Sequence, residues 1–339
     1  MFRSHNNARV GYCFLIASSI LFSLSSCDNK NLFPSDLYPE THLWSILLGD
    51  GTSSKQLTNF HDNDFFFTAK DIEGEWIVFK TPNSGVTSRT SSNTRSELGE
   101  INQWTPMQGG TLNATVKVQH ATSSGNPSVP ASFSVVIGQI HSVEGHENEP
   151  LKIFYRKYPN HKRGSVYWNY EINTKGSNDQ RWDVSIPVWG DDMSVCSDNP
   201  DEFPKEPKDG IALGESFQYS ISVKKGVMTL RFTHPNKTAK TFVKSLVKST
   251  FSDSVAIPEQ VKRWYTPLGR KGTELEIAYK GERQIFKIGA YNQSNGKSSS
   301  ENLVWHTDAE TYGGNIQRQY ETGNYVEVWF KDISVQHPE

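Results

Sequence analysis

The chain has 339 residues and a formal net charge of −2, and 12% of its residues are aromatic. A protein with this charge balance has no global positive field, so it would need a local basic cleft to bind a polyanion. We therefore expect no nucleic acid among its partners. The length suits one large domain or two small ones, and no motif argues for two.

The N-terminal residues 1–27 predict a lipoprotein signal peptide. Arg3 and Arg9 precede an apolar run, Gly11 to Leu24, which is too short and too rich in serine for a spanning helix. The run ends in Leu24-Ser-Ser-Cys27, which resembles the bacterial lipobox, whose cysteine is lipidated and becomes the first residue. An ordinary signal peptide is the alternative. We expect a lipid anchor at Cys27 that holds the chain at a membrane of the bacterial cell envelope, on the periplasmic side or the outer surface.

Residues 28–39 are polar with two prolines, and they predict a tether between the lipid and a domain over residues 40–339. Beyond Cys27 the chain has a single cysteine, Cys196, so an intramolecular disulfide is excluded there. The domain must be held together by its core, and we expect a monomer.

From residue 40 onward the sequence consists of short runs rich in β-branched and aromatic residues, separated by Gly, Asn, Ser and Pro. Most runs alternate polar with apolar residues, as antiparallel strands with one buried face do. Helical periodicity is scarce, and the best candidate is residues 241–250. Many strands without intervening helices predict a β-sandwich or jelly roll. The expected strands include residues 75–80, 111–118, 132–137, 165–172, 216–223, 227–232, 274–279 and 325–333. Residues 83–93, 141–150 and 190–210 are expected to be surface loops, which act as connectors or as lids.

Three segments far apart in the sequence each place polar residues on one face of a strand. Side chains in a strand point alternately to opposite faces, and the residues between the polar ones are mostly apolar. Three sets therefore share a face within their own segments: Arg95 with Glu97, Gln139 with His141, and Lys287 with Tyr291 and Gln293.

Together these side chains meet the needs of cleaving an acidic sugar chain by β-elimination. The guanidinium of Arg95 suits the uronate carboxylate, and the amide of Gln139 can stabilise that carboxylate as its charge moves toward an enolate. A neutral His141 can take the C5 proton. Tyr291 can protonate the departing O4, and Glu97 can orient Arg95 or bind a sugar hydroxyl. Each residue alone is typical of an ordinary sheet surface, so the hypothesis depends on their combination.

The three segments resemble the signature regions of the alginate lyases of polysaccharide lyase family seven, which are β-jelly rolls. They read Arg95-Ser-Glu-Leu-Gly99, Gln139-Ile-His141 and Ile285 to Gln293 (IFKIGAYNQ), and the similarity spans roughly residues 40–339. The resemblance implies a jelly roll with a concave substrate cleft and an acidic polysaccharide (alginate) as partner. We expect no cofactor or metal, because Arg95 and Gln139 can supply the carboxylate stabilisation. The resemblance also implies the catalytic set Arg95, Gln139, His141 and Tyr291, with Glu97, Lys287, Asn292 and Gln293 expected to bind substrate.

One departure from the family pattern is Gly99, which stands where a second arginine is usual. Lys152 and Arg156 are candidates for supplying the missing cation. Otherwise the enzyme would accept a different uronan, such as glucuronan. The isoleucine of Gln139-Ile140-His141 resembles family members that accept guluronate-containing chains.

Three other functions compete with this one. A non-catalytic jelly-roll lectin would bind acidic glycans without a base and an acid. A glycoside hydrolase needs two carboxylates flanking the bond, and the nearest run, Asp71-Ile-Glu73-Gly-Glu75, has the wrong order and spacing. Nothing specific points to a structural or adhesion protein. The histidines and glutamates of residues 141–149 are more typical of a solvated loop than of a metal site, with a calcium ion as the alternative.

Overall fold

The computed structural model describes residues 1, 32–87, 91–144, 149–172, 182–247, 281–298 and 306–338. Residues 32–339 form one compact unit. The expected signal peptide beyond Met1, including Cys27, and the expected strand 274–279 lie outside the described residues. No helix within the described ranges is long and apolar enough to cross a membrane.

A nine-stranded antiparallel sheet forms one layer of the unit, with β7, β15 and β5 next to one another near its middle. Its order is β10-β9-β8-β7-β15-β5-β1-β2, and β11 pairs with β9. The strands are β1 (Trp44–Leu47), β2 (Ser53–Ser54), β5 (Arg95–Glu100), β7 (Ser134–Ser142), β8 (Leu151–Arg156), β9 (Arg163–Ile172), β10 (Trp182–Trp189), β11 (Ile211–Ala212) and β15 (Gln284–Asn292).

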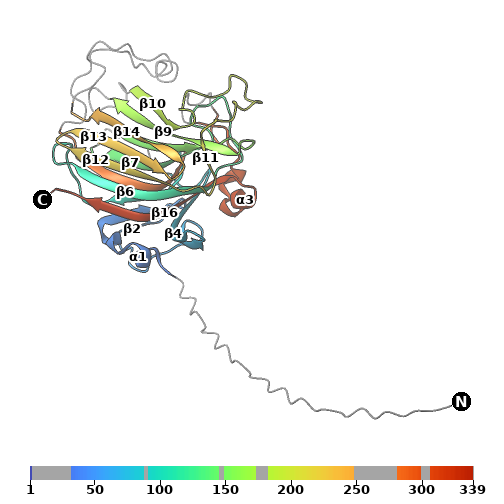
Figure 1. The fold of residues 1–339 in the computed structure, drawn as a ribbon, viewed down its shortest axis with the longest axis horizontal. Helices are drawn as coiled ribbons and strands as arrows, with labels where there is room; N and C mark the ends of the chain where they lie inside the picture. The colour runs from blue at the N-terminus through green and yellow to red at the C-terminus, as the bar shows by residue number, and fades with distance from the viewer. Residues whose placement is uncertain are drawn as a thin grey trace. The chain divides into compact units, whose positions relative to one another are not determined.

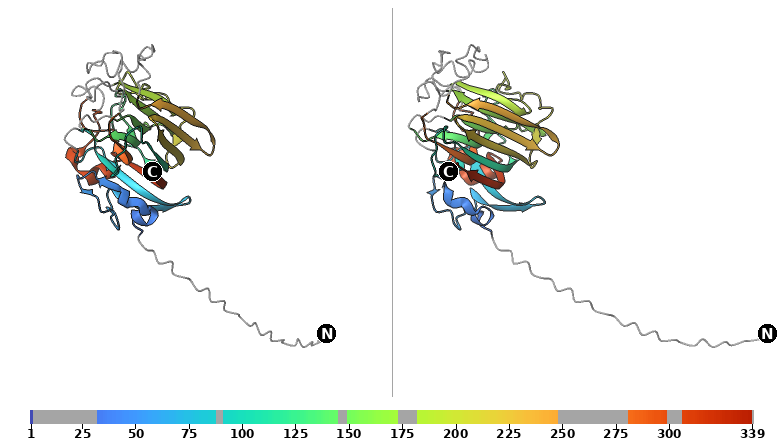
Figure 2. Two further views of the ribbon diagram at one scale, coloured as in Figure 1. Left: turned by 90° about the vertical axis from the view of Figure 1, so that its left-hand side faces the viewer. Right: turned by 60° about the vertical axis from the view of Figure 1, so that its left-hand side comes forward.

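A seven-stranded antiparallel sheet forms the other layer and stacks on the first face to face (Figures 1 and 2). Its order is β14 (Lys237–Ser245), β13 (Val227–His234), β12 (Phe217–Lys224), β6 (Gly110–His120), β16 (Tyr325–Gln336), β4 (Gly74–Pro82) and β3 (Phe66–Asp71). The helical elements are short: α1 (Pro34–Leu37), η1 (Pro39–Leu43), η4 (Tyr312–Gly314) and α3 (Ile316–Glu321).

The core lies between the two sheets. Leu98, Ile140 and Ile288 come from the three polar segments and are fully buried, in one apolar cluster with Phe79 and Phe330 of the other sheet. These are the alternate residues that the sequence assigns to the inner face. The all-β jelly roll expected from the sequence is therefore confirmed, and the polar residues of the same strands face away from the core.

Two sequence expectations are wrong. The residues of the expected helix 241–250 that the structure describes as a regular element belong to β14, which pairs with β13 through contacts such as Arg231 with Thr241. Pairing with β13 and the strand preference of the β-branched residues in this stretch outweigh its weak helical pattern. The tether is also shorter than expected, because residues 32–39 pack on the domain: Thr68 donates a hydrogen bond to the Leu32 carbonyl (2.8 Å), and Tyr38 is buried.

Candidate active site

The register of β7, β15 and β5 brings the three polar segments side by side. Tyr291 pairs with Arg95, and Lys287 pairs with Gly99 on one side and with Gln139 on the other. Residues that pair directly across antiparallel strands share a face. The expected arrangement on adjacent strands is therefore present.

An irregularity in β7 sets which of its residues face the site. The register shifts between Val136 and Gly138, and a Cβ added at Gly138 would lie 2.8 Å from the hydroxyl of Tyr219, a core residue. Ile137 and Gly138, which are successive residues of β7, therefore both point toward the core, as in a β-bulge. Val136 joins Tyr291 in a cluster on the site side, and Gln139 and His141 follow on that same side.

Glu97 lies at the centre of the polar network. Lys287 Nζ donates to its Oε2 over 2.8 Å, Arg95 donates to the same oxygen over 3.4 Å, and Gln139 Nε2 donates to Oε1. The side chain of Glu97 is 2% exposed. Of the two roles expected for Glu97, orientation of its neighbours is the one that this geometry supports.

The charges in this network determine the protonation of Glu97. Burial alone would raise the pKa of the Glu97 carboxyl, but the charges of Lys287 and Arg95 outweigh it and hold the pKa below its usual value. Burial lowers the pKa of Lys287, while Glu97 opposes that shift. The carboxylate is therefore ionised and holds both cations in place.

Arg95 and Tyr291 are in direct contact. The guanidinium carbon lies 3.7 Å from the centroid of the Tyr291 ring, and Ser91 bridges the two side chains. Ser91 Oγ accepts a hydrogen bond from Arg95 (3.1 Å) and lies 3.1 Å from the Tyr291 hydroxyl. Ser91 could not be predicted from the sequence, because a serine in a Ser/Thr/Asn-rich loop carries no signal that distinguishes it from its neighbours.

His141 is a neutral imidazole whose Nε2 carries the lone pair. Nδ1 lies 2.6 Å from the carbonyl oxygen of Ser142, which can only accept a hydrogen bond, so Nδ1 bears the proton. Burial, followed by the charge of Lys287, lowers the pKa of His141 to about 4. A fifth of its side chain remains exposed (20%), so Nε2 is available as a general base.

A chain of charged side chains begins beside Nε2 of His141. Glu149 Oε1 is 3.7 Å from His141 Nε2, and Lys152 Nζ donates to Glu149 Oε2 over 2.9 Å. Lys152 also lies 3.6 Å from Glu171, which is buried. The negative charge nearest to Nε2 favours the imidazolium that forms when the base takes a proton.

Lys152 and Arg156 do not lie beside Gly99, although the sequence made them candidates for the missing cation. Both lie on β8, and β7 and β15 separate β8 from β5. Lys152 is paired with Glu149, and four backbone carbonyls accept hydrogen bonds from Arg156. The suggestion is therefore wrong, because both cations are already used within the fold.

Asn292 and Gln293 have structural contacts. Asn292 is fully buried on the opposite face of β15 from Tyr291, where its amide donates to the carbonyl of Pro82 (3.1 Å) and to Asn83 (3.0 Å). This placement contradicts its expected role in binding substrate and gives it a role in joining the two sheets. Gln293 is buried, and its amide donates to the carbonyl of Tyr291 (3.1 Å).

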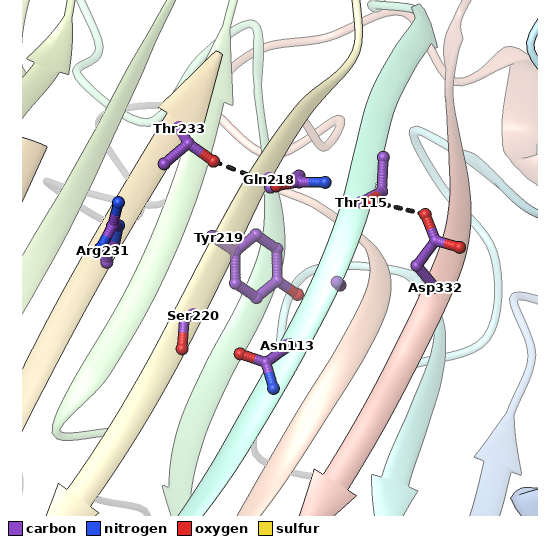
Figure 3. Close-up of a pocket in the computed structure, with 9 residues that line it drawn as sticks. Asn113, Thr115, Gln218, Tyr219, Ser220, Arg231, Thr233 and Asp332 are labelled. Atoms are coloured by element: carbon purple, nitrogen blue, oxygen red, sulfur yellow. Dashed lines mark hydrogen bonds between the residues drawn. The ribbon is translucent and has the colours of Figure 1, made fainter. Parts of the chain in front are cut away.

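A pocket of about 410 Å³ opens beside the network, over β1, β2, β5 and β15. Gly99 lies on its wall, and the pocket also contacts Arg95, Glu97 and Lys287. A second hollow, of about 420 Å³, lies on the seven-stranded sheet (Figure 3). Its lining residues include Asp332, which accepts a hydrogen bond from Thr115 (2.9 Å), and Tyr219, whose hydroxyl donates to the carbonyl of Ile137 (3.0 Å). In the part of the chain that is described, no group of three or more His, Cys, Asp or Glu side chains is placed to hold a metal ion.

Comparisons with known proteins agree with this geometry. The alginate lyase family model matches residues 40–337. An alginate lyase of Klebsiella pneumoniae is 30% identical in an alignment of length 318 that covers 83% of this chain and 90% of the relative. The crystal structure of the exolytic PL7 alginate lyase AlyA5 from Zobellia galactanivorans is 55% identical, with a TM-score of 0.87 over 91% of this chain and 98% of that one. A family 7 alginate lyase in complex with product, A1-II′, shares the fold at 18% identity and a TM-score of 0.54, over 90% of this chain and 99% of that one.

The jelly roll, together with the match to the alginate lyase family model and the alginate lyase relatives, makes this protein a polysaccharide lyase. The family match covers most of this chain and includes all the segments that form the site. The chain belongs to the alginate lyase family.

Proposed function

We propose that this alginate lyase works by β-elimination with Arg95, Gln139, His141 and Tyr291, and that it acts from the chain end. Arg95 and the remaining N–H of the Gln139 amide bind the uronate carboxylate, which makes the C5 hydrogen acidic. At guluronate, His141 Nε2 takes that proton. The electron pair forms the C4=C5 double bond as the C4–O4 bond breaks, and the Tyr291 hydroxyl protonates O4.

The observation that supports this proposal most strongly is that a neutral His141 lies on the same sheet face as Tyr291, which is in contact with Arg95. General acid–base catalysis needs an unprotonated base and a protonated acid in reach of one sugar. The Nδ1 contact with Ser142 leaves Nε2 free to accept a proton, and the Tyr291 hydroxyl lies 3.1 Å from Ser91, which is itself bonded to Arg95. Action from the chain end is supported by the relative AlyA5, which is described as exolytic.

The test is incubation with alginate rich in mannuronate, alginate rich in guluronate, and glucuronan. We expect the ultraviolet band of a C4=C5 product from alginate, with guluronate-containing chains as good substrates, and a small product from the first turnovers. Cleavage without the band would indicate a hydrolase, and binding without cleavage would indicate a lectin. If only glucuronan gave the band, the substrate would be glucuronan and not alginate.

The cellular location is a further part of the proposal. The lipobox-like Leu24-Ser-Ser-Cys27 supports an enzyme anchored by a lipid at Cys27 to the bacterial cell envelope, and we expect it to be a monomer. Expression of the full chain in a bacterium with labelled palmitate tests this. We expect label and protein in the membrane fraction, and the Cys27→Ser chain should lose both. A wild-type chain that is unlabelled and soluble would contradict the anchor.

A further inference from the structure

The pocket of about 410 Å³ beside Gly99 contains a cation whose charge the protein does not balance. Three cationic side chains line this pocket, namely Arg95, Lys287 and Lys55. Glu97 contacts Lys287 (2.8 Å) and Arg95 (3.4 Å), and both of these cations are largely buried. Lys55 is exposed, and within the residues that the structure describes neither a hydrogen bond nor an ion pair engages its ammonium. Its charge is therefore available to an anion that enters the pocket.

The pairing of the strands places Lys55 in the same row of the sheet as Gly99. Ile46 of β1 pairs with Ser54 of β2, so the residue after Ser54 lies opposite the residue before Ile46, which is Ser45. Ser45 in turn pairs with Gly99 of β5. Residues that pair directly across antiparallel strands share a face. Lys55, Ser45 and Gly99 therefore follow one another on the face that lines the pocket.

The row between Lys55 and Gly99 contains only small side chains. A Cβ added at Gly99 would lie 3.9 Å from the Ser45 hydroxyl, and that hydroxyl donates to the Gly99 carbonyl over 3.1 Å. Neighbouring strands lie about 4.8 Å apart, so β2 and β5 are separated by about 10 Å. The flexible four-carbon stem of a lysine can extend from the end of β2 over Ser45. The ammonium of Lys55 can therefore approach the space that a long side chain at position 99 would enter.

The backbone around Lys55 is held by a local turn. Ser54 Oγ donates a hydrogen bond to the Gln56 carbonyl and accepts one from the Gln56 N–H, both over 3.0 Å. Leu57 follows and is buried in the core between the sheets. Since the backbone is fixed on both sides of Lys55, binding an anion there requires the ordering of the side chain alone.

We infer that Lys55 is a substrate-binding residue, which binds a uronate carboxylate at the rim of this pocket in place of the arginine that is usual at position 99. This inference rests on the proposed function of the site. The pocket reaches Arg95, so a chain whose reacting carboxylate is bound there has a neighbouring sugar at the pocket. That sugar carries its own carboxylate in a uronan and none in a neutral glycan. Lys55 therefore selects chains that are anionic beyond the reacting sugar.

The contribution of Lys55 should appear in binding and should depend on salt. A contact with a sugar that does not react is the same in the ground state and in the transition state, so its loss raises KM and leaves kcat nearly unchanged. The partner is an exposed side chain, so the ion pair is weak and is screened as the ionic strength rises.

Four variants test this role. Lys55→Met removes the charge and keeps an unbranched side chain, whereas Lys55→Arg keeps the charge. Lys224→Met is the matched control, because Lys224 is an exposed lysine at the end of β12 on the other sheet. Gly99→Arg combined with Lys55→Met tests whether a cation at position 99 replaces that of Lys55.

Two measurements separate binding from turnover. The ultraviolet band of the unsaturated product gives KM and kcat on alginate at low and at high salt. Calorimetric titration with an oligoguluronate gives Kd without turnover when each variant is made in the Tyr291→Phe protein. The Tm of every variant shows whether it is folded.

We expect Lys55→Met to raise KM and Kd about fivefold at low salt with little change in kcat. This difference should shrink at high salt. Lys55→Arg and Lys224→Met should match the wild type, and Gly99→Arg should recover most of the affinity that Lys55→Met loses.

A folded Lys55→Met protein with the wild-type Kd would overturn the inference, as would a double variant that binds no better than Lys55→Met. A loss in kcat with unchanged KM would also overturn it, because Lys55 would then act on the chemical step. A wild type that forms no unsaturated product contradicts the proposed function itself, and the Kd values then still decide whether Lys55 binds the uronate.

Discussion

The guanidinium of Arg95 lies over the ring of Tyr291, with its carbon 3.7 Å from the ring centroid. A cation at this distance is attracted to the ring face, and Ser91 bonds to Arg95 while lying 3.1 Å from the phenolic oxygen. In the proposed mechanism, the group that binds the uronate carboxylate therefore also holds the ring of the acid. A sugar bound through its carboxylate at Arg95 would then lie beside the Tyr291 hydroxyl, which we propose protonates its O4.

His141 should matter more for guluronate than for mannuronate. In mannuronate the C5 hydrogen and O4 lie on the same side of the ring, so Tyr291 can act as base and acid. In guluronate they lie on opposite sides, and a separate base is needed. We expect His141→Ala to lower kcat about 10²–10⁴-fold on guluronate-rich alginate and clearly less on mannuronate-rich alginate. Equal losses on both polymers would instead make His141 a general substrate contact.

Glu149 should control the basicity of His141. Glu149 Oε1 lies 3.7 Å from Nε2, and its charge raises the His141 pKa, against burial, Lys287 and Arg95, which lower it to about 4. Glu149→Gln should therefore lower the pKa further, move the acid limb of the kcat/KM profile to lower pH and reduce the rate at neutral pH. Glu144→Gln is the control, because that carboxylate bonds Arg283 at the surface. If the acid limb of Glu149→Gln stayed at the wild-type pH, Glu149 would not control the basicity of His141.

The faces of β5, β7 and β15 were predictable, but the contacts on those faces were not. Alternation alone placed Arg95 and Tyr291 on the site face. The same alternation puts Asn292 on the opposite face, and the error there came from the family motif. Ser91 and Glu149 approach from loops, whose side-chain positions depend on the folded sheet. Arg156 belongs to a strand, but its partners are backbone carbonyls of two distant loops, which leave no pattern in the sequence.

Gly99 should tolerate an arginine. A Cβ added there would meet Lys287, Ile285 and Ser45 no closer than 3.7 Å, which is ordinary contact, and the pocket lies beside it. We expect Gly99→Arg to lower KM on alginate with little change in kcat, as an added uniform binding contact does. Steady-state kinetics check this. A folded variant that has lost activity on alginate would mean that the pocket accommodates part of the natural substrate, and glucuronan or a mixed uronan would become the first candidate.

His337 should stabilise the fold at acidic pH and less at alkaline pH. Its Nδ1 lies 3.0 Å from the carbonyl of Gly109, and its Nε2 contacts the buried carboxylate of Glu100. Both partners are acceptors, so the ring is held as imidazolium, and the hydrogen bond with Glu100 raises its pKa. A raised folded-state pKa gives stability that is complete below the unfolded value, about 6.5, and lost as pH rises through the folded value.

For this partly exposed pair we expect a contribution of about 1 kcal/mol to the free energy of unfolding at acidic pH. The difference in Tm between the wild type and His337→Gln should therefore be largest below the unfolded pKa of about 6.5 and should shrink as the pH rises above it. His42→Gln, at an exposed histidine, should show no such trend. A difference in Tm that stays constant across this range would mean that His337 acts through packing alone.

The central claim is that the Tyr291 hydroxyl delivers the proton that completes elimination, and the ultraviolet absorbance of unsaturated product from alginate measures it directly. Tyr291→Phe removes only that hydroxyl, and Tyr312→Phe is the control at an exposed tyrosine. We expect the wild type and Tyr312→Phe to form product at similar rates. Tyr291→Phe should keep its Tm and lose about 10²–10⁴-fold in kcat. A folded Tyr291→Phe enzyme that retains most of the activity would contradict the account.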